Sequence, residues 1–238
     1  MLKRVTTTAL GAGVIAGIFL TVLQHFTLMP LIRHAEIYER AAEAVTQSAA
    51  PAGEAAAHEH EVGTEAPSAE ATIILTIGYA LGQALLLTGA FAISGRSLSG
   101  REGVFWGLAG FATFALAPSM GLAPEVPGAV AADVSARQVW WVMCVLGTAA
   151  GLTALVFGKR RWLIPVGLFL LAAPHIIGAP QPVGESVGLA PPELAAEFAA
   201  RALGVAFVFW SMMGWVAGTL YTRHGRGLPR TMMGIEHD

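Results

Sequence analysis

Six long stretches of the 238-residue chain contain no charged residue when histidine is counted as neutral. A helix needs about 20 apolar residues to cross the hydrocarbon core of a bilayer. The stretches contain 28, 25, 22, 21, 23 and 21 residues and are Val5–Ile32, Ala71–Gly95, Gly103–Pro124, Gln138–Gly158, Trp162–Gly184 and Ala202–Thr222. The pattern therefore predicts an all-α polytopic membrane protein that forms one integral membrane domain over residues 1–238, with six spans at about 5–32, 71–95, 103–124, 138–158, 162–178 and 202–222.

Two of the six predicted spans contain a proline near their far end, Pro118 in the third and Pro174 in the fifth. Helices usually end before the residue that precedes a proline, so we expect these two spans to end early. The first span, Val5–Ile32, follows a basic N-terminus as a signal peptide would. It is too long for a signal h-region and lacks a small-residue cleavage site, so we expect it to be retained as a membrane helix.

The cationic residues predict how the chain is oriented, because cytoplasmic loops are enriched in Lys and Arg. With both termini in the cytoplasm, ten of the 14 Lys and Arg residues lie inside, among them Lys159–Arg161. Thirteen of the 16 acidic residues then lie outside, which gives a formal charge of +7 inside and −9 outside. The topology rule does not require the acidic excess outside, and that excess favours a face that attracts cations.

Composition and motifs exclude several classes of protein. Hydrophobic residues make up 55 % of the chain and charged residues 13 %, against about 25 % charged in soluble domains. The single cysteine, Cys144, excludes disulfide scaffolds and zinc sites built from cysteines. The net charge of −2 leaves no basic footprint for nucleic acid. Because HExxH, CxxC, G-x-S-x-G and P-loop motifs are missing, we expect neither an enzyme nor a permanently bound cofactor.

The first outer segment, Arg33–Glu70, combines a helical pattern with a flexible linker. A helix is expected to continue past the membrane from His34, and residues 47–70, rich in Ala, Pro, Glu and Ser, are expected to form the linker. This linker contains a run of alternating imidazole and carboxylate side chains that can capture a divalent cation loosely. The alternative is a solvated acidic linker; the run consists of His58, Glu59, His60 and Glu61.

The third and fifth spans end in similar proline- and glycine-rich breaks, Pro118–Pro124 and Pro174–Pro180. Each break has the form P-x5-P and is followed by an acid four residues before an arginine. This similarity suggests that spans three–four and five–six are a tandem repeat in parallel orientation. Irregular backbone at membrane depth must be buried in protein or face water. We therefore expect the two breaks to line a common outer vestibule.

The predicted topology brings histidines and carboxylates to this same side of the membrane. Such a set suits Co, Ni, Zn or Mn better than Cu(I), and its members are His25, His34, Glu36, Glu39, Glu125, Asp133 and His175. The alternatives are an interfacial polar role for His25, a bond from His175 to a carbonyl freed by proline, and ion pairing of Asp133 and Glu197 with Arg137 and Arg201. Trp140 and Trp141 are expected in an interfacial aromatic belt, and Met212 and Met213 in packing.

The first predicted span ends in Gln-His followed by a proline, and five motifs follow it: A-E-x-Y-E at 35–39, P-E-x-P-G at 124–128, R-Q-x-W-W at 137–141, P-H-I-I-G-A-P at 174–180 and P-P-E-L-A-A-x-F-A at 191–199. In this order the motifs resemble the CbtA family of proposed cobalt transporter subunits. The resemblance implies a bacterial inner-membrane protein of cobalt uptake, associated with cobalamin metabolism. It also implies a small single-span partner with histidines, of the CbtB type.

Three functions follow in order of support. The first is a subunit of a cobalt uptake transporter that passes Co²⁺, or Ni²⁺, from an acidic, histidine-containing outer vestibule. Only the resemblance selects cobalt over nickel. The second is a non-transporting scaffold or assembly subunit that binds a partner through its outer loops. The third, a membrane enzyme or a protein that handles quinones, has the least support because the motifs are missing.

Overall fold

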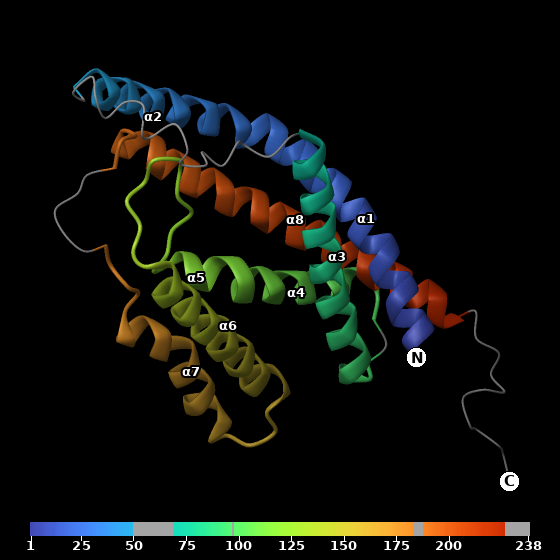
Figure 1. Ribbon diagram of the computed structural model, residues 1–238. Coiled ribbons are helices and arrows are strands. Elements are labelled where there is room, and N and C mark those ends of the chain that lie inside the picture. Colours follow the sequence, from blue (N-terminus) through green and yellow to red (C-terminus); the bar gives the residue numbers. More distant parts are fainter. Residues whose placement is uncertain (50–68, 97, 183–187, 227–238) are drawn as a thin grey trace, which may run out of the picture. The chain divides into compact units, whose positions relative to one another are not determined.

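The computed structural model describes residues 1–49, 69–96, 98–182 and 188–226. Its regular structure in these ranges is entirely helical, which confirms the predicted all-α class (Figure 1). The helices are α1 (Leu2–Thr27), α2 (Met29–Ala49), α3 (Ala69–Ser94), α4 (Gly100–Phe111), the π-helix η1 (Ala112–Leu116), α5 (Ala117–Ser119), α6 (Val134–Phe157), α7 (Leu163–Ile177) and α8 (Pro192–Arg226). Most of the predicted linker 47–70, including His58, Glu59, His60 and Glu61, lies outside the described residues.

Four helices of the described chain are long and apolar enough to cross a membrane. They are Leu2–Thr27, Glu70–Ser94, Val134–Phe157 and Pro192–Gly225, and they correspond to the first, second, fourth and sixth predicted spans. The fifth predicted span contains α7, which is apolar but has only 15 residues. The third is helical without a gap from residue 100 to 119 but is divided into α4, η1 and α5. Four membrane helices are therefore supported, and six crossings remain a prediction.

The two prolines that were expected to end the third and fifth spans lie inside helical structure instead. Pro118 belongs to α5, which directly follows the π-helix η1. The wider π turn is one of the local adjustments by which a helix accommodates a proline. Pro174 lies inside α7, which continues to Ile177. Proline leaves the carbonyl four residues earlier without its helical partner, and the carbonyl oxygen of Leu170 faces Gly147 of α6, where a Cβ would be only 2.9 Å away.

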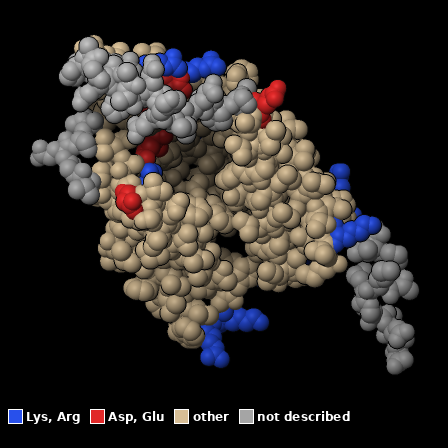
Figure 2. All heavy atoms as spheres, in the orientation of Figure 1, with Lys and Arg blue, Asp and Glu red and all other residues tan. Residues whose placement is uncertain are grey.

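The described helices form two compact units, and the helices α1, α3, η1 and α8 contribute residues to both. Unit 1 consists of Met1–Val22, Thr72–Ala112 and Ala206–Asp238, and unit 2 of Leu23–Ala71 and Thr113–Val205. The predicted single membrane domain, residues 1–238, stays a prediction. The face shown in Figure 2 is mostly uncharged, and Lys, Arg, Asp and Glu side chains gather in a few places on it. This clustering of the charged side chains agrees with the long uncharged runs of the sequence.

Unit 1 packs its helices through glycines. A Cβ on Gly13 of α1 would lie 2.8 Å from the Cα of Leu81 in α3, and one on Gly214 of α8 would collide with the Gly103 carbonyl of α4. Gly103 and Gly107 meet the backbone of α8 in the same way. Such small-xxx-small contacts let membrane helices approach closely, because lipid provides no hydrophobic force between them. The buried Met213, with 0 % exposure, confirms its predicted packing role.

The chain ends of unit 1 are joined by polar contacts. The Arg4 side chain donates from Nε to the Tyr221 carbonyl at 2.7 Å, and its guanidinium carbon lies 3.6 Å from the centroid of the Tyr221 ring. One helical turn further along α1, the buried Thr8 hydroxyl lies 3.0 Å from Nδ1 of His224. These contacts fix the start of α1 against the end of α8.

Unit 2 contains a helical hairpin, formed by α6 and α7, and the helix α2. Gly151 of α6 and Gly167 of α7 face each other's carbonyl, at 2.8 and 3.0 Å from an ideal Cβ. The basic turn Lys159–Arg161 connects the two helices. The expected helix beyond the first span is confirmed as α2, which buries Leu31 and Ala35. Unit 2 holds all of the described residues that were predicted as metal ligands.

Candidate functional site

The two proline- and glycine-rich breaks lie against each other in unit 2. A Cβ on Gly121 of the first break would lie 2.9 Å from the Cβ of Ala179 in the second. Further along the same segments, the backbone N–H of Leu189 donates to the Gly128 carbonyl at 3.2 Å. Gly128 and Gly178 have φ angles of +72° and +86°, which residues with a Cβ rarely adopt. The two breaks are thus in contact, whereas the common outer vestibule and the tandem repeat stay predictions.

Trp140 connects the two breaks from α6. Its indole N–H donates to the carbonyl of Pro174 at 3.1 Å, and its ring meets the His175 ring edge-on with centroids 6.0 Å apart. Gly121 leaves space for the indole, because a Cβ there would lie 2.5 Å from it. With 2 % exposure, Trp140 is not a residue of an aromatic belt, so the prediction is wrong for Trp140, while for Trp141, with 38 % exposure, it stays a prediction. The buried N–H of Trp140 has a protein partner and does not need the interface.

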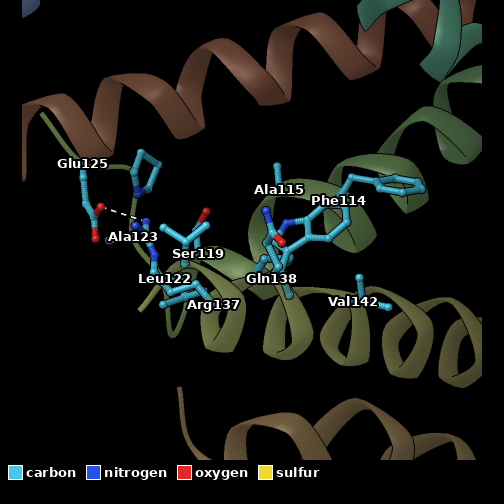
Figure 3. Close-up of a pocket in the computed structure, with 13 residues that line it drawn as sticks. Phe114, Ala115, Ser119, Leu122, Ala123, Glu125, Arg137, Gln138 and Val142 are labelled. Atoms are coloured by element: carbon cyan, nitrogen blue, oxygen red, sulfur yellow. Dashed lines mark hydrogen bonds and ion pairs between the residues drawn. The ribbon is translucent and has the colours of Figure 1, made fainter. Parts of the chain in front are cut away.

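A pocket of about 590 Å³ lies beside the first break (Figure 3). Its walls come from η1, α5, the segment that follows α5 and the first three turns of α6. Nine of its 13 lining residues are apolar, and the polar ones are Ser119, Glu125, Arg137 and Gln138. Three of the lining residues, Phe114, Gln138 and Val142, were not predicted from the sequence. The helical spacing of Val134, Gln138 and Trp141 on α6 was a usable signal, because residues three and four apart share a helix face.

Glu125 and Arg137 form an ion pair at this pocket. The Arg137 Nη2 donates to the Glu125 Oε2 at 2.8 Å, and the two side chains are about one-third exposed. The predicted pairing of Arg137 with Asp133 is therefore wrong. The pairing predicted for the second break is confirmed, because Arg201 lies 2.5 Å from Glu197.

Asp133 caps α6 instead of pairing with Arg137. Its Oδ1 accepts the Ser135 hydroxyl at 2.5 Å and the backbone N–H of Ala136 at 3.0 Å. These hydrogen bonds, that of Ser135 most of all, lower the pKa of the Asp133 carboxyl from its ordinary value of 3.8. Aspartate is a preferred N-cap because its oxygen satisfies a free N–H of the first turn.

The other predicted ligands lie on helix ends and on α2. His25 is exposed in the last turn of α1 with its ring edge-on to Phe26, and His34 is exposed in α2 next to Tyr38. Glu36 pairs with Arg40 at 3.2 Å, and Glu39 is half-buried on the same helix. Among the residues that the structure describes, no three His, Cys, Asp or Glu side chains come close enough to hold a metal ion together. Their role as ligands stays a prediction, as does that of the run His58–Glu61 outside the described ranges.

The site thus combines irregular backbone with one ion pair and a mostly apolar pocket. A bare cation loses its hydration energy in apolar surroundings, which costs several kcal/mol even after relaxation. Carbonyl groups of the breaks and side chains at the helix ends are therefore better suited to an ion than the pocket interior. The pocket itself is better suited to a ligand with an apolar body.

Comparison with known proteins identifies the family. The family model described as "Probable cobalt transporter subunit (CbtA)" matches residues 2–222. No curated protein and no solved structure matches the chain. The match covers nearly the whole sequence and confirms the resemblance indicated by the motifs, so the chain belongs to the CbtA family of probable cobalt transporter subunits.

Proposed function

We propose that the protein is the membrane subunit through which Co²⁺, or Ni²⁺, enters, and that the ion passes the paired breaks of unit 2. The observation that carries this proposal is the contact of Gly121 with Ala179, which joins two irregular segments at the ends of apolar helices. Non-helical backbone at membrane depth is tolerated where it is buried in protein or lines a water-filled cavity. Paired breaks of this kind supply carbonyl oxygens that can replace the water of a passing ion.

The acidic excess of the predicted outer segments would concentrate cations near the breaks. Long-range attraction of this kind raises the local concentration of a cation and weakens as salt is added. In the proposed path, His25 and His175 exchange for hydration water while Glu36 or Glu125 supplies negative charge. Both carboxylates sit in partly exposed ion pairs with arginine. Such pairs contribute only about 0–1 kcal/mol, so a divalent cation can compete for these oxygens.

A partner subunit belongs to this proposal. The family description names the chain a subunit of a transporter, and the sequence carries no P-loop that would hydrolyse ATP. We propose a small single-span protein with histidines, of the CbtB type, as the partner. Histidines at its end could receive the ion from the breaks or deliver it there.

The proposal is tested by uptake of radioactive cobalt into cells that express His25→Ala, His175→Ala or the double variant at equal levels. Loss of even an indirect metal contact reduces affinity roughly tenfold or more, so the double variant is expected to lose uptake at limiting cobalt by about that factor. The exposed neighbours Phe26 and Ile176 provide matched controls as alanine variants. Normal uptake in the double variant would refute these ligand assignments.

Proteoliposomes separate transport from a scaffold role. The purified chain, with and without the candidate partner, is tested for uptake of several divalent metals. A transporter subunit accumulates cobalt under at least one of the two conditions. A metal-independent complex that transports nothing in either condition would favour the non-transporting scaffold.

A further inference from the structure

The pocket beside the first break has a composition that transport of a small cation does not explain. Phe114, Leu122, Trp141 and Val142 give it mostly apolar walls, and its volume of about 590 Å³ is that of a typical ligand site. Figure 3 shows Phe114 and Ala115 on one side, with Gln138 and Val142 of α6 on the other. Its occupant should therefore have an apolar body and only a small polar part.

The polar part of the occupant is defined by the Glu125–Arg137 pair. One cationic and one anionic side chain lie 2.8 Å apart beside the pocket, and both retain access to solvent. A guanidinium has five N–H donors and can bind a phosphate while one of them remains on Glu125. The carboxylate likewise has two oxygens, and Arg137 engages only one of them at this distance. The pair thus offers complementary positions for a phosphate and an ammonium group on the same molecule.

We propose that this pocket binds a zwitterionic phospholipid, with its phosphate at Arg137, its ammonium group at Glu125 and its glycerol and upper acyl chain between η1 and α6. The source of the ligand is the membrane, because one wall of the pocket is formed by the first turns of a helix that is itself a candidate span, Val134–Phe157. The start of such a helix lies at the level of the lipid head groups. The site assigned here does not depend on the proposed path of the ion.

The surface next to the pocket continues its apolar character. Val134, Trp141 and Val142 line the pocket and are also 63 %, 38 % and 47 % exposed, so an acyl chain can leave the pocket along this face of α6. A half-exposed tryptophan next to an arginine is typical of a membrane interface. An anionic lipid without an ammonium group would place no positive charge at Glu125, so the pair is expected to prefer the zwitterion.

The experiment is native mass spectrometry of the purified full-length chain with dioleoylphosphatidylethanolamine or dioleoylphosphatidylglycerol at equal concentration. The wild type should retain the ethanolamine lipid preferentially. Because a charged hydrogen bond contributes more than a neutral one, Glu125→Gln should weaken ethanolamine lipid binding roughly five- to tenfold and leave glycerol lipid binding unchanged. Arg137→Gln should weaken binding of both lipids. Glu197→Gln removes one partner of a comparable exposed ion pair away from the pocket and serves as the matched control.

A steric variant and a soluble competitor complete the test. Ala115→Trp fills the pocket and leaves both charges in place, so it should also reduce binding of the ethanolamine lipid. Glycerophosphoethanolamine without acyl chains should fail to displace the lipid at the same concentration. Equal retention of both lipids by the wild type, unchanged binding in Glu125→Gln, Arg137→Gln and Ala115→Trp, or full displacement by the soluble head group would each overturn the proposal.

Discussion

Trp140 determines how the two breaks are held at the level of single residues. Its indole packs on Gly121 of the first break and donates to the carbonyl of Pro174, the first residue of the second break. A phenyl ring could fill most of the same space but could not donate a hydrogen bond. The N–H therefore adds a specific connection to what is otherwise van der Waals packing.

Trp140→Phe is expected to destabilise the protein by about 1 kcal/mol, because a buried hydrogen bond contributes that much and the carbonyl retains the N–H of Gly178 as a partner. Thermal unfolding in detergent measures this loss. Trp141→Phe is the control, since Trp141 is half-exposed at the pocket. Equal stability of Trp140→Phe and the wild type would contradict a structural role for the indole N–H.

Asp133 and Glu197 show why equal spacing led to different contacts. Each acid stands four residues before an arginine, a spacing that brings side chains together only inside a helix. Glu197 lies within α8 and pairs with Arg201. Asp133 is the N-cap of α6 with ψ of 133°, and its carboxylate caps the first turn instead. The sequence shows the spacing of acid and arginine directly, but it does not show at which residue α6 begins.

The capping role of Asp133 predicts a dependence of stability on pH. The folded pKa of its carboxyl is lowered below 3.8, so its contribution is fully present above the ordinary pKa and is lost as pH falls through the lowered pKa. Asp133→Ala should therefore lower the melting temperature by a few degrees at pH 7. The difference from the wild type should shrink below pH 4. A constant difference down to pH 3 would contradict this origin.

At the scale of helices, the uncharged runs predicted where helices occur better than whether each helix is continuous. Four runs became long apolar helices, and the run from Gly103 to Pro124 became α4, η1 and α5. The prolines marked the irregular places correctly but did not end the helices there. The reason is local: a π turn precedes Pro118, and Pro174 stands so near the end of α7 that few helical bonds are lost. A hydropathy pattern contains no information about such turns.

Glycines provide the test of packing between helices. Gly214→Ala in α8 would place a methyl group against the Gly103 carbonyl, and we expect a loss of about 1–3 kcal/mol from overpacking. Gly204→Ala on the same helix meets nothing within 4 Å. It should be neutral or stabilising by up to about 1 kcal/mol, because alanine favours the helix. Thermal unfolding of both variants distinguishes close packing from a general intolerance of α8 to substitution.

At the scale of the whole molecule, the sequence predicted a membrane protein of the matched family but not the composition of its site. Charge runs and motif order are local properties of the chain. The contacts of Arg137 with Glu125 and of Gly121 with Ala179 depend on how distant segments pack, so the sequence could suggest only that the breaks lie together. The predicted topology placed the metal ligands on one side of the membrane. Topology determines how deep in the membrane a residue lies, but it does not determine the distance between two side chains.

A topology with six crossings and one with four place the segments around Ala131 and Arg160 on opposite sides of the membrane. Finding the side on which each segment lies therefore distinguishes the two topologies. With six crossings, Ala131 lies outside and Arg160 inside, as the basic turn Lys159–Arg161 favours. If only the four long helices cross, these two positions exchange sides. Both residues are exposed, and the sole natural thiol, Cys144, is buried with 0 % exposure, so single-cysteine variants should be labelled above a low background. We expect a membrane-impermeant maleimide to label Ala131→Cys in intact cells and Arg160→Cys only after permeabilisation. Labelling in the reverse order would show that the segments containing α4 and α7 do not cross the membrane.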